Sequence, residues 1–172
     1  MAPWQGAASK DLAEIDAAIG LLRRARMHLD AGLTGFEVMG AFALQLQARH
    51  FPLLRNPLPA SPWTVLLELA AGDATEASQR LSSLMEEAEG LGLASDAVVA
   101  GNLAQAHALW ELRESIPLAQ AREGLNIKHD VALPVSAIPD FLRHMDTSLD
   151  ALVPGVRMVV FGHLGDGNLH FN

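Results

Sequence analysis

The sequence contains no cysteine and no tyrosine, and only 12 of its 172 residues are lysine or arginine. Without cysteine, the chain has no disulfide scaffold, thiolate zinc finger, iron–sulfur cluster or cysteine nucleophile. Its 20 acidic residues leave a net charge of −8, which repels phosphate backbones and argues against a nucleic-acid partner. The sequence also shows no transmembrane segment and no signal peptide, and we predict a cytoplasmic protein.

What remains is a globular composition, with 50% hydrophobic and 19% charged residues. The length is that of one domain with a real core, so we predict a single domain over residues 1–172. Prolines are concentrated in the segment from His50 to Pro62. Because proline fixes φ and removes a hydrogen-bond donor, this segment is predicted to be an extended connector.

The spacing of apolar residues predicts several amphipathic helices. The first is expected from about Lys10 to Ala31, with Ser9 capping its start and Gly32 its end. A second is expected from Thr34, which has capping-box spacing to Glu37. The other predicted helices begin near Asp73, at Asn102 and at Ser136.

Four apolar or alternating segments are predicted to be strands: Trp63–Leu69, Ala97–Val99, Ile127–Leu133 and Val156–Leu164. We therefore predict an α+β fold, with a ferredoxin-like antiparallel or mixed sheet and helices on one face. A parallel doubly wound sheet is the alternative, but no glycine-rich phosphate loop follows an early strand.

The end of the chain carries the most informative local pattern. Asp166-Gly167 is typical of a two-residue hairpin turn, which would place His163 directly opposite His170. Imidazoles about 5 Å apart on one face can ligate one metal ion. Two histidines near a turn can equally be ordinary polar surface residues, and a catalytic zinc site normally has three protein ligands.

Several motifs resemble one known family. His-Leu-Gly-Asp-Gly-Asn-Leu-His at 163–170 resembles the signature of the C-terminal domain of FAD-linked D-2-hydroxyacid dehydrogenases. This group includes flavin-dependent D-lactate dehydrogenase, the glycolate oxidase FAD subunit and D-2-hydroxyglutarate dehydrogenase. Three further segments match family motifs in the same order: Leu33–Met39, Trp110–Ile116 and Lys128–Pro134.

The resemblance implies a metal- and substrate-binding domain. His163 and His170 would ligate a divalent metal, often zinc. Arg113 and Lys128 would hold the carboxylate of a small 2-hydroxy acid, and Asn168 would line the same pocket. Read from the residues alone, Arg113 is equally a helix-end residue and Lys128 a solvated strand residue. Pro117 stands where the family often has a hydroxyl side chain, which leaves the identity of the acid open.

The resemblance also implies partners. Hydride would pass to FAD, held mainly by an FAD-binding domain that the sequence does not contain. The family's third metal ligand and its base come from a Glu-His pair beyond His170, so no catalytic base is assigned here. We expect a C-terminal domain truncated at both ends, inactive by itself, weakly metal-binding and homo-oligomeric. The alternatives are a free-standing α+β module that binds a small carboxylate or a metal without catalysis, and a structural remnant that only oligomerises.

Overall fold

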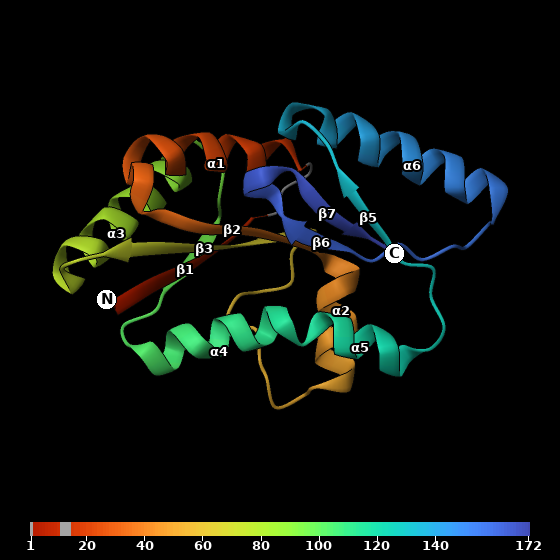
Figure 1. Ribbon diagram of the computed structural model, residues 1–172, viewed down its shortest axis with the longest axis horizontal. Coiled ribbons are helices and arrows are strands. Elements are labelled where there is room, and N and C mark those ends of the chain that lie inside the picture. Colours follow the sequence, from red (N-terminus) through yellow and green to blue (C-terminus); the bar gives the residue numbers. More distant parts are fainter. Residues whose placement is uncertain (1, 11–14) are drawn as a thin grey trace.

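The computed structural model describes residues 2–10 and 15–172 (Figure 1). The strands are β1 (Ala2–Lys10), β2 (Leu33–Gly40), β3 (Trp63–Ala71), β4 (Asp96–Val99), β5 (His129–Ala132), β6 (Val160–His163) and β7 (Asn168–Phe171). The α-helices are α1 (Asp16–Leu29), α2 (Ala41–His50), α3 (Ala74–Gly90), α4 (Leu103–Glu114), α5 (Ile116–Glu123) and α6 (Ile138–Leu152). Short 3₁₀ turns cover Asp30–Gly32, Val135–Ala137 and Leu164–Asp166.

All the described strands belong to one sheet of order β4-β1-β3-β2-β6-β7-β5. Every neighbouring pair is antiparallel. The segment β4-β1-β3-β2, with α1 and α3 as its connecting helices, has the strand order of a ferredoxin-like fold. The predicted α+β class and antiparallel sheet are therefore confirmed. Strands β6, β7 and β5 extend this core.

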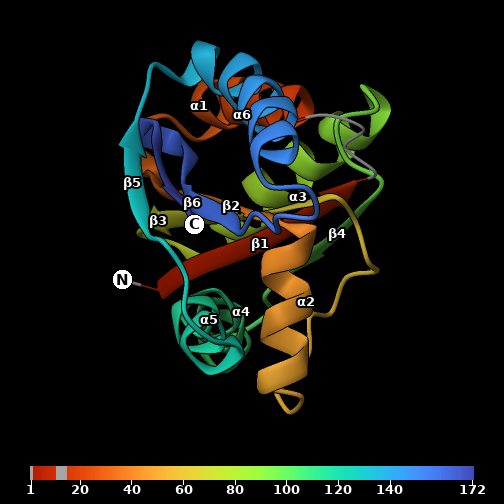
Figure 2. The ribbon, with the colours of Figure 1, turned by 90° about the vertical axis from the view of Figure 1, so that its right-hand side faces the viewer.

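Helices cover both faces of the sheet, whereas the sequence analysis expected them on one. In two perpendicular views α1, α3 and α6 lie on one face, and α2, α4 and α5 lie on the other (Figures 1 and 2). Strand β3 explains why. Val65 and Leu67 belong to the core under α1 and α3, while Leu66 belongs to the core under α2 and α4. A central strand that is apolar on both faces needs cover on both.

Two N-terminal predictions are wrong. Lys10 and Ser9 lie in strand β1, so Ser9 does not cap a helix, and α1 begins only at Asp16. Residues 11–14 of the predicted helix lie outside the described residues. Thr34 does not open a helix either, because it lies in strand β2, and the second helix begins at Ala41. Strand β2 is hydrogen-bonded to β3 and β6, and these distant partners outweigh the local capping-box pattern.

Most later elements match the prediction. The proline-rich segment separates α2 from β3 without regular structure. Helix α3 begins at the predicted place, where the Asp73 side chain accepts a hydrogen bond from the Glu76 amide. Helix α6 is preceded by a 3₁₀ turn rather than by a side-chain cap from Ser136. None of the described helices has the length and hydrophobicity needed to cross a membrane.

Candidate functional site

The predicted hairpin is present, but its register differs from the prediction. Phe161, not His163, stands opposite His170. The loop contains the four residues Leu164–Gly167, which form a 3₁₀ turn closed by Gly167 at φ 80°. A two-residue turn would have put His163 and His170 opposite each other, whereas the longer loop offsets them by two positions. That part of the hairpin prediction is wrong.

Glu37 of strand β2 connects His163 to the sheet interior. The pairing of β2 with β6 places Glu37 opposite His163, and the carboxylate Oε1 contacts the His163 ring at Nδ1. The Glu37 side chain is fully buried, while that of His163 is 53% exposed. One ring edge of His163 therefore faces a buried anion, and the ring itself reaches solvent.

Arg113, in the last turn of α4, lies on the other side of Glu37. Its Nε donates a hydrogen bond of 2.8 Å to Glu37 Oε2, and its side chain is only 10% exposed. The guanidinium also stacks over the ring of Phe161, 5.1 Å from its centroid. This is a buried, charge-compensated position, and it differs from that of an ordinary solvated arginine at a helix end.

His170 completes the group. Its ring lies 4.7 Å from that of Phe161, and its Nδ1 contacts the carboxylate of Asp130 on the neighbouring strand β5. We call Glu37, Arg113, His163, Phe161 and His170 the histidine face. Its contacts are continuous from His163 through Glu37, Arg113 and Phe161 to His170. The face lies on the α4 side of the sheet.

The other two residues predicted for the site, Lys128 and Asn168, are not part of the histidine face. Lys128 is exposed and precedes β5, two residues before the Asp130 that contacts His170. Asn168 opens β7 opposite Ala132, and its backbone amide donates to the Asp166 side chain. No side-chain contact joins either residue to the histidine face among the contacts described.

The donor chemistry of the histidine face suits a metal ion in part. A carboxylate at Nδ1 of a histidine is the partner commonly found when Nε2 ligates a metal, because it fixes the ring and its tautomer. Both His163 and His170 have such a partner. Within residues 2–10 and 15–172, however, no cluster of three or more His, Asp or Glu side chains is arranged to hold an ion. Among the described residues the face thus brings together two candidate ligands, His163 and His170, and no third.

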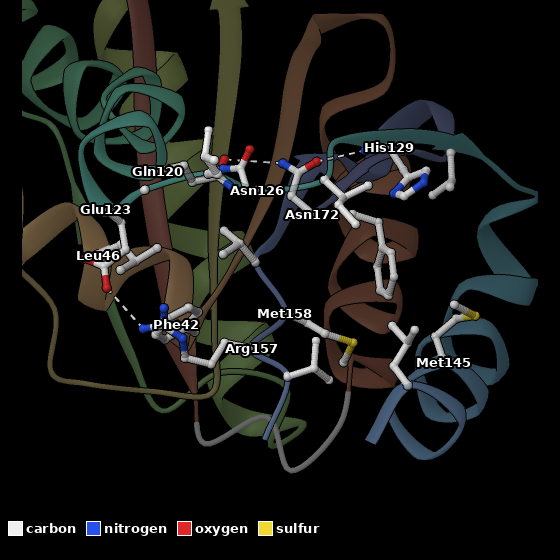
Figure 3. Close-up of a pocket in the computed structure, with 18 of the residues that line it drawn as sticks. Phe42, Leu46, Gln120, Glu123, Asn126, His129, Met145, Arg157, Met158 and Asn172 are labelled. Atoms are coloured by element: carbon white, nitrogen blue, oxygen red, sulfur yellow. Dashed lines mark hydrogen bonds and ion pairs between the residues drawn. The ribbon is translucent and has the colours of Figure 1, made fainter. Parts of the chain in front are cut away.

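Two cavities lie near this region. A polar cavity of about 310 Å³ has His163 in its wall, together with Arg26, Asp30, Thr34 and Asp166. The second, of about 720 Å³, is largely apolar and lies between α2, α5, α6 and the end of β7 (Figure 3). It shares none of the residues of the histidine face. The smaller cavity is therefore the one that opens next to His163, whereas His170 lines neither of the two cavities.

Glu123 lines the larger cavity and is contacted by basic side chains from two segments, helix α2 and the stretch before β6. His50 Nε2 lies 2.8 Å from one carboxylate oxygen, and Arg49 and Arg157 contact the other at 2.7 and 3.0 Å. The hydrogen bond from His50 and those from Arg157 and Arg49 lower the pKa of Glu123 from 4.5 to about 2. This network ties α2 and α5 to the segment before β6.

Sequence reasoning missed Glu37 and the partner role of Asp130. The capping-box spacing from Thr34 to Glu37 predicts a helix start there, and the alternation of Ile127–Leu133 makes Asp130 only a same-face neighbour of a solvated Lys128. Residues Phe36–Gly40 are all buried in the structure, so apolar–polar alternation does not mark Glu37 as a strand residue, and its place in the motif Leu33–Met39 was the signal available in the sequence. The pairing of β2 with β6 is what makes Glu37 a site residue.

Comparisons with known proteins place the chain in a family. Residues 3–172 match the family described as FAD linked oxidases, C-terminal domain. The chain is 38% identical over 141 residues to mitochondrial D-2-hydroxyglutarate dehydrogenase of Rattus norvegicus, covering 81% of this chain and 26% of that protein. It is 36% identical over 140 residues to the enzyme of the same name from Danio rerio, with the same coverage of 81% and 26%.

A relative with another name is similar over most of the chain. A putative mitochondrial D-lactate dehydrogenase of Schizosaccharomyces pombe is 31% identical over 156 residues, covering 86% of this chain and 30% of that protein. The chain thus spans between about a quarter and a third of the length of these relatives. It belongs to the family of FAD linked oxidase C-terminal domains.

Proposed function

We propose that this chain is the substrate- and metal-binding domain of an FAD-dependent dehydrogenase that oxidises a D-2-hydroxy acid to a 2-oxo acid. The observation that carries the proposal is the histidine face. It presents two histidines with carboxylate-supported Nδ1 atoms beside a buried arginine. Family membership and the printed names of the relatives agree with this chemistry.

A 2-hydroxy acid offers one carboxylate and one hydroxyl, and the proposed residues divide between them. His163 and His170 would hold a divalent ion, with zinc as the proposed metal, through Nε2, since Nδ1 of each ring faces a carboxylate. Arg113 and Lys128 would bind the substrate carboxylate, with Asn168 in the same pocket. A bound ion would supply polarisation of the 2-hydroxyl, whose proton would go to a base not assigned among these residues, and FAD would supply the acceptor for the hydride from C2.

The partners follow from the same proposal. FAD is the family's cofactor, and we propose that an FAD-binding domain holds it, so that the chain by itself turns over no substrate.

We also propose that the chain associates with copies of itself. Strand β5 forms one edge of the sheet. Leu125 and Ile127, just before β5 in the chain, and Leu152 and Val153, at the end of α6, expose more than half of their surface. Open strand edges and apolar patches favour pairing between copies, and sedimentation of the purified chain would test this.

The metal site can be tested on the chain alone. We expect calorimetric titration with Zn²⁺ to show weak binding of one ion, because a two-ligand site leaves the ion largely hydrated. His163→Ala and His170→Ala should each abolish this binding. His144→Ala, on the exposed face of α6, is the matched control and should bind as the unchanged chain does. Zinc binding that survives both site substitutions would contradict the proposed site.

The substrate is tested on the same sample. D-2-hydroxyglutarate should bind to the zinc-loaded chain and should bind more weakly after the zinc is removed with a chelator. A hydroxy acid that binds equally well with and without zinc would contradict the role given to the ion.

A further inference from the structure

Glu37 stands out among the buried polar groups of the described residues. With Arg113 it is one of the two ionisable side chains that are buried there, and Glu37 is the one with no exposed surface. It lies in a central strand between β3 and β6. A carboxylate in such a place is costly unless its charge is compensated, so its partners are expected to be specific.

The two oxygens of Glu37 serve different partners. Oε2 accepts the hydrogen bond from Arg113 Nε, and Oε1 faces the His163 ring at Nδ1. Oε1 meets the geometric criteria for a hydrogen bond with none of the described residues, and the His163 ring is the polar group that approaches it. One buried carboxylate therefore connects a proposed metal ligand with a proposed substrate-binding arginine.

This arrangement favours one of the two neutral tautomers of His163. A carboxylate oxygen accepts hydrogen bonds, so in the neutral ring the nitrogen that faces it, Nδ1, is the one expected to carry the proton. Nε2 then keeps its lone pair, which is the form that binds a metal ion. The bond to Arg113 involves Nε and leaves the two terminal nitrogens to other partners.

We propose that Glu37 is a positioning residue that sets both the tautomer of His163 and the placement of Arg113, and so couples the metal site to the carboxylate site. The inference rests on the proposed function for its consequences in binding, but its effect on His163 is a property of the metal-free chain. Asp130 makes a similar contact with His170, yet its side chain is 71% exposed, so it is expected to fix its histidine less firmly.

Replacement of Glu37 by glutamine is expected to change the tautomer of His163. In Glu37→Gln the amide oxygen must face Arg113, because Arg113 can only donate. The amide NH₂ then faces His163 Nδ1, which becomes the acceptor, and the proton moves to Nε2. We expect long-range ¹H–¹⁵N spectra of the histidines to show His163 protonated at Nδ1 in the unchanged chain and at Nε2 in Glu37→Gln. Zinc affinity should fall about 10- to 100-fold.

A second variant separates positioning from folding. In the double variant Glu37→Gln with Arg113→Met, the amide oxygen is free to face His163. The Nδ1–H tautomer and most of the zinc affinity should return, although Arg113 is lost. A merely structural role for Glu37 predicts no such recovery. Circular dichroism of each variant checks that it is folded.

Asp130→Asn is the matched control, and it should lower zinc affinity less than Glu37→Gln does. An unchanged His163 tautomer in Glu37→Gln would overturn the inference, as would an equal loss in Asp130→Asn. If the unchanged chain bound no zinc, the proposed function would fail, while the tautomer of His163 in the metal-free chain would still decide the role of Glu37.

Discussion

Gly167 lies directly against the backbone of Leu133, so that a β-carbon added to Gly167 would stand 2.0 Å from the Leu133 carbonyl oxygen. The Leu133 amide donates a hydrogen bond of 3.0 Å to the Gly167 carbonyl. Gly167 also has φ 80°, in the left-handed region that favours glycine. The contact joins the loop after His163 to the end of the strand that carries Asp130, so it holds two parts of the site together.

Gly167→Ala is therefore expected to destabilise the protein. The new methyl group would collide with backbone atoms, which cannot move aside as a flexible side chain can, and the left-handed conformation adds strain. We expect a loss of at least about 2 kcal/mol in the free energy of unfolding, measured by urea titration. Gly90→Ala is the control, because a β-carbon there meets nothing within 4 Å at the end of α3. Equal stability of the two variants would contradict this account.

The network around Glu123 predicts a pH dependence of stability. The pKa of Glu123 is lowered from 4.5 to about 2 in the folded chain, chiefly by the hydrogen bond from His50 and then by Arg157. A carboxyl group with a lowered folded-state pKa stabilises the fold above its unfolded pKa. That contribution is present above about pH 4.5 and is lost as the pH falls toward 2.

Glu123→Gln should remove this part of the pH dependence. Urea unfolding between pH 7 and pH 3 should show a smaller loss of stability in the variant than in the unchanged chain. Glu114→Gln, at an exposed position near the end of α4, is the control and should keep the original slope. If Glu123→Gln had the same slope as the control, the ion pairs of Glu123 would not contribute in solution.

The fold could be predicted from sequence where local patterns and tertiary structure agree. Asp73 and Glu76 predict the start of α3, and the apolar run from Trp63 predicts β3. Thr34 and Glu37 show the opposite case, because their spacing fits a helix cap while their backbone pairs with strands far away in the sequence. Capping is a local signal, and strand pairing is not.

In the candidate site, too, the sequence predicts the residues involved but not how they are arranged. The motifs identified His163, His170 and Arg113, and the structure brings these three together through Glu37 and Phe161. Their mutual arrangement was not predictable, because Asp166-Gly167 signals a turn without fixing its length. The four-residue loop places His163 two positions away from the residue opposite His170. The buried partner of His163, Glu37, follows only from the pairing of β2 with β6.

Lys128 allows the proposed carboxylate site to be tested separately from the metal. We expect Lys128→Ala to weaken binding of D-2-hydroxyglutarate to the zinc-loaded chain by about 10-fold, as for loss of one charge-assisted hydrogen bond. Glutarate, which lacks the 2-hydroxyl, should lose affinity by the same factor. Removal of zinc, in contrast, should weaken the hydroxy acid more than glutarate, because glutarate has no hydroxyl for the ion to bind.

Calorimetric titrations with both acids, with and without zinc, measure the four affinities needed. The Lys128 side chain is exposed, so stability should change by no more than about 0.5 kcal/mol, and a binding loss would not reflect unfolding. Arg23→Ala removes an exposed cation from α1 and controls for the change in net charge. If Arg23→Ala weakened binding as much as Lys128→Ala, the effect would come from the overall charge, and Lys128 would not be a carboxylate ligand.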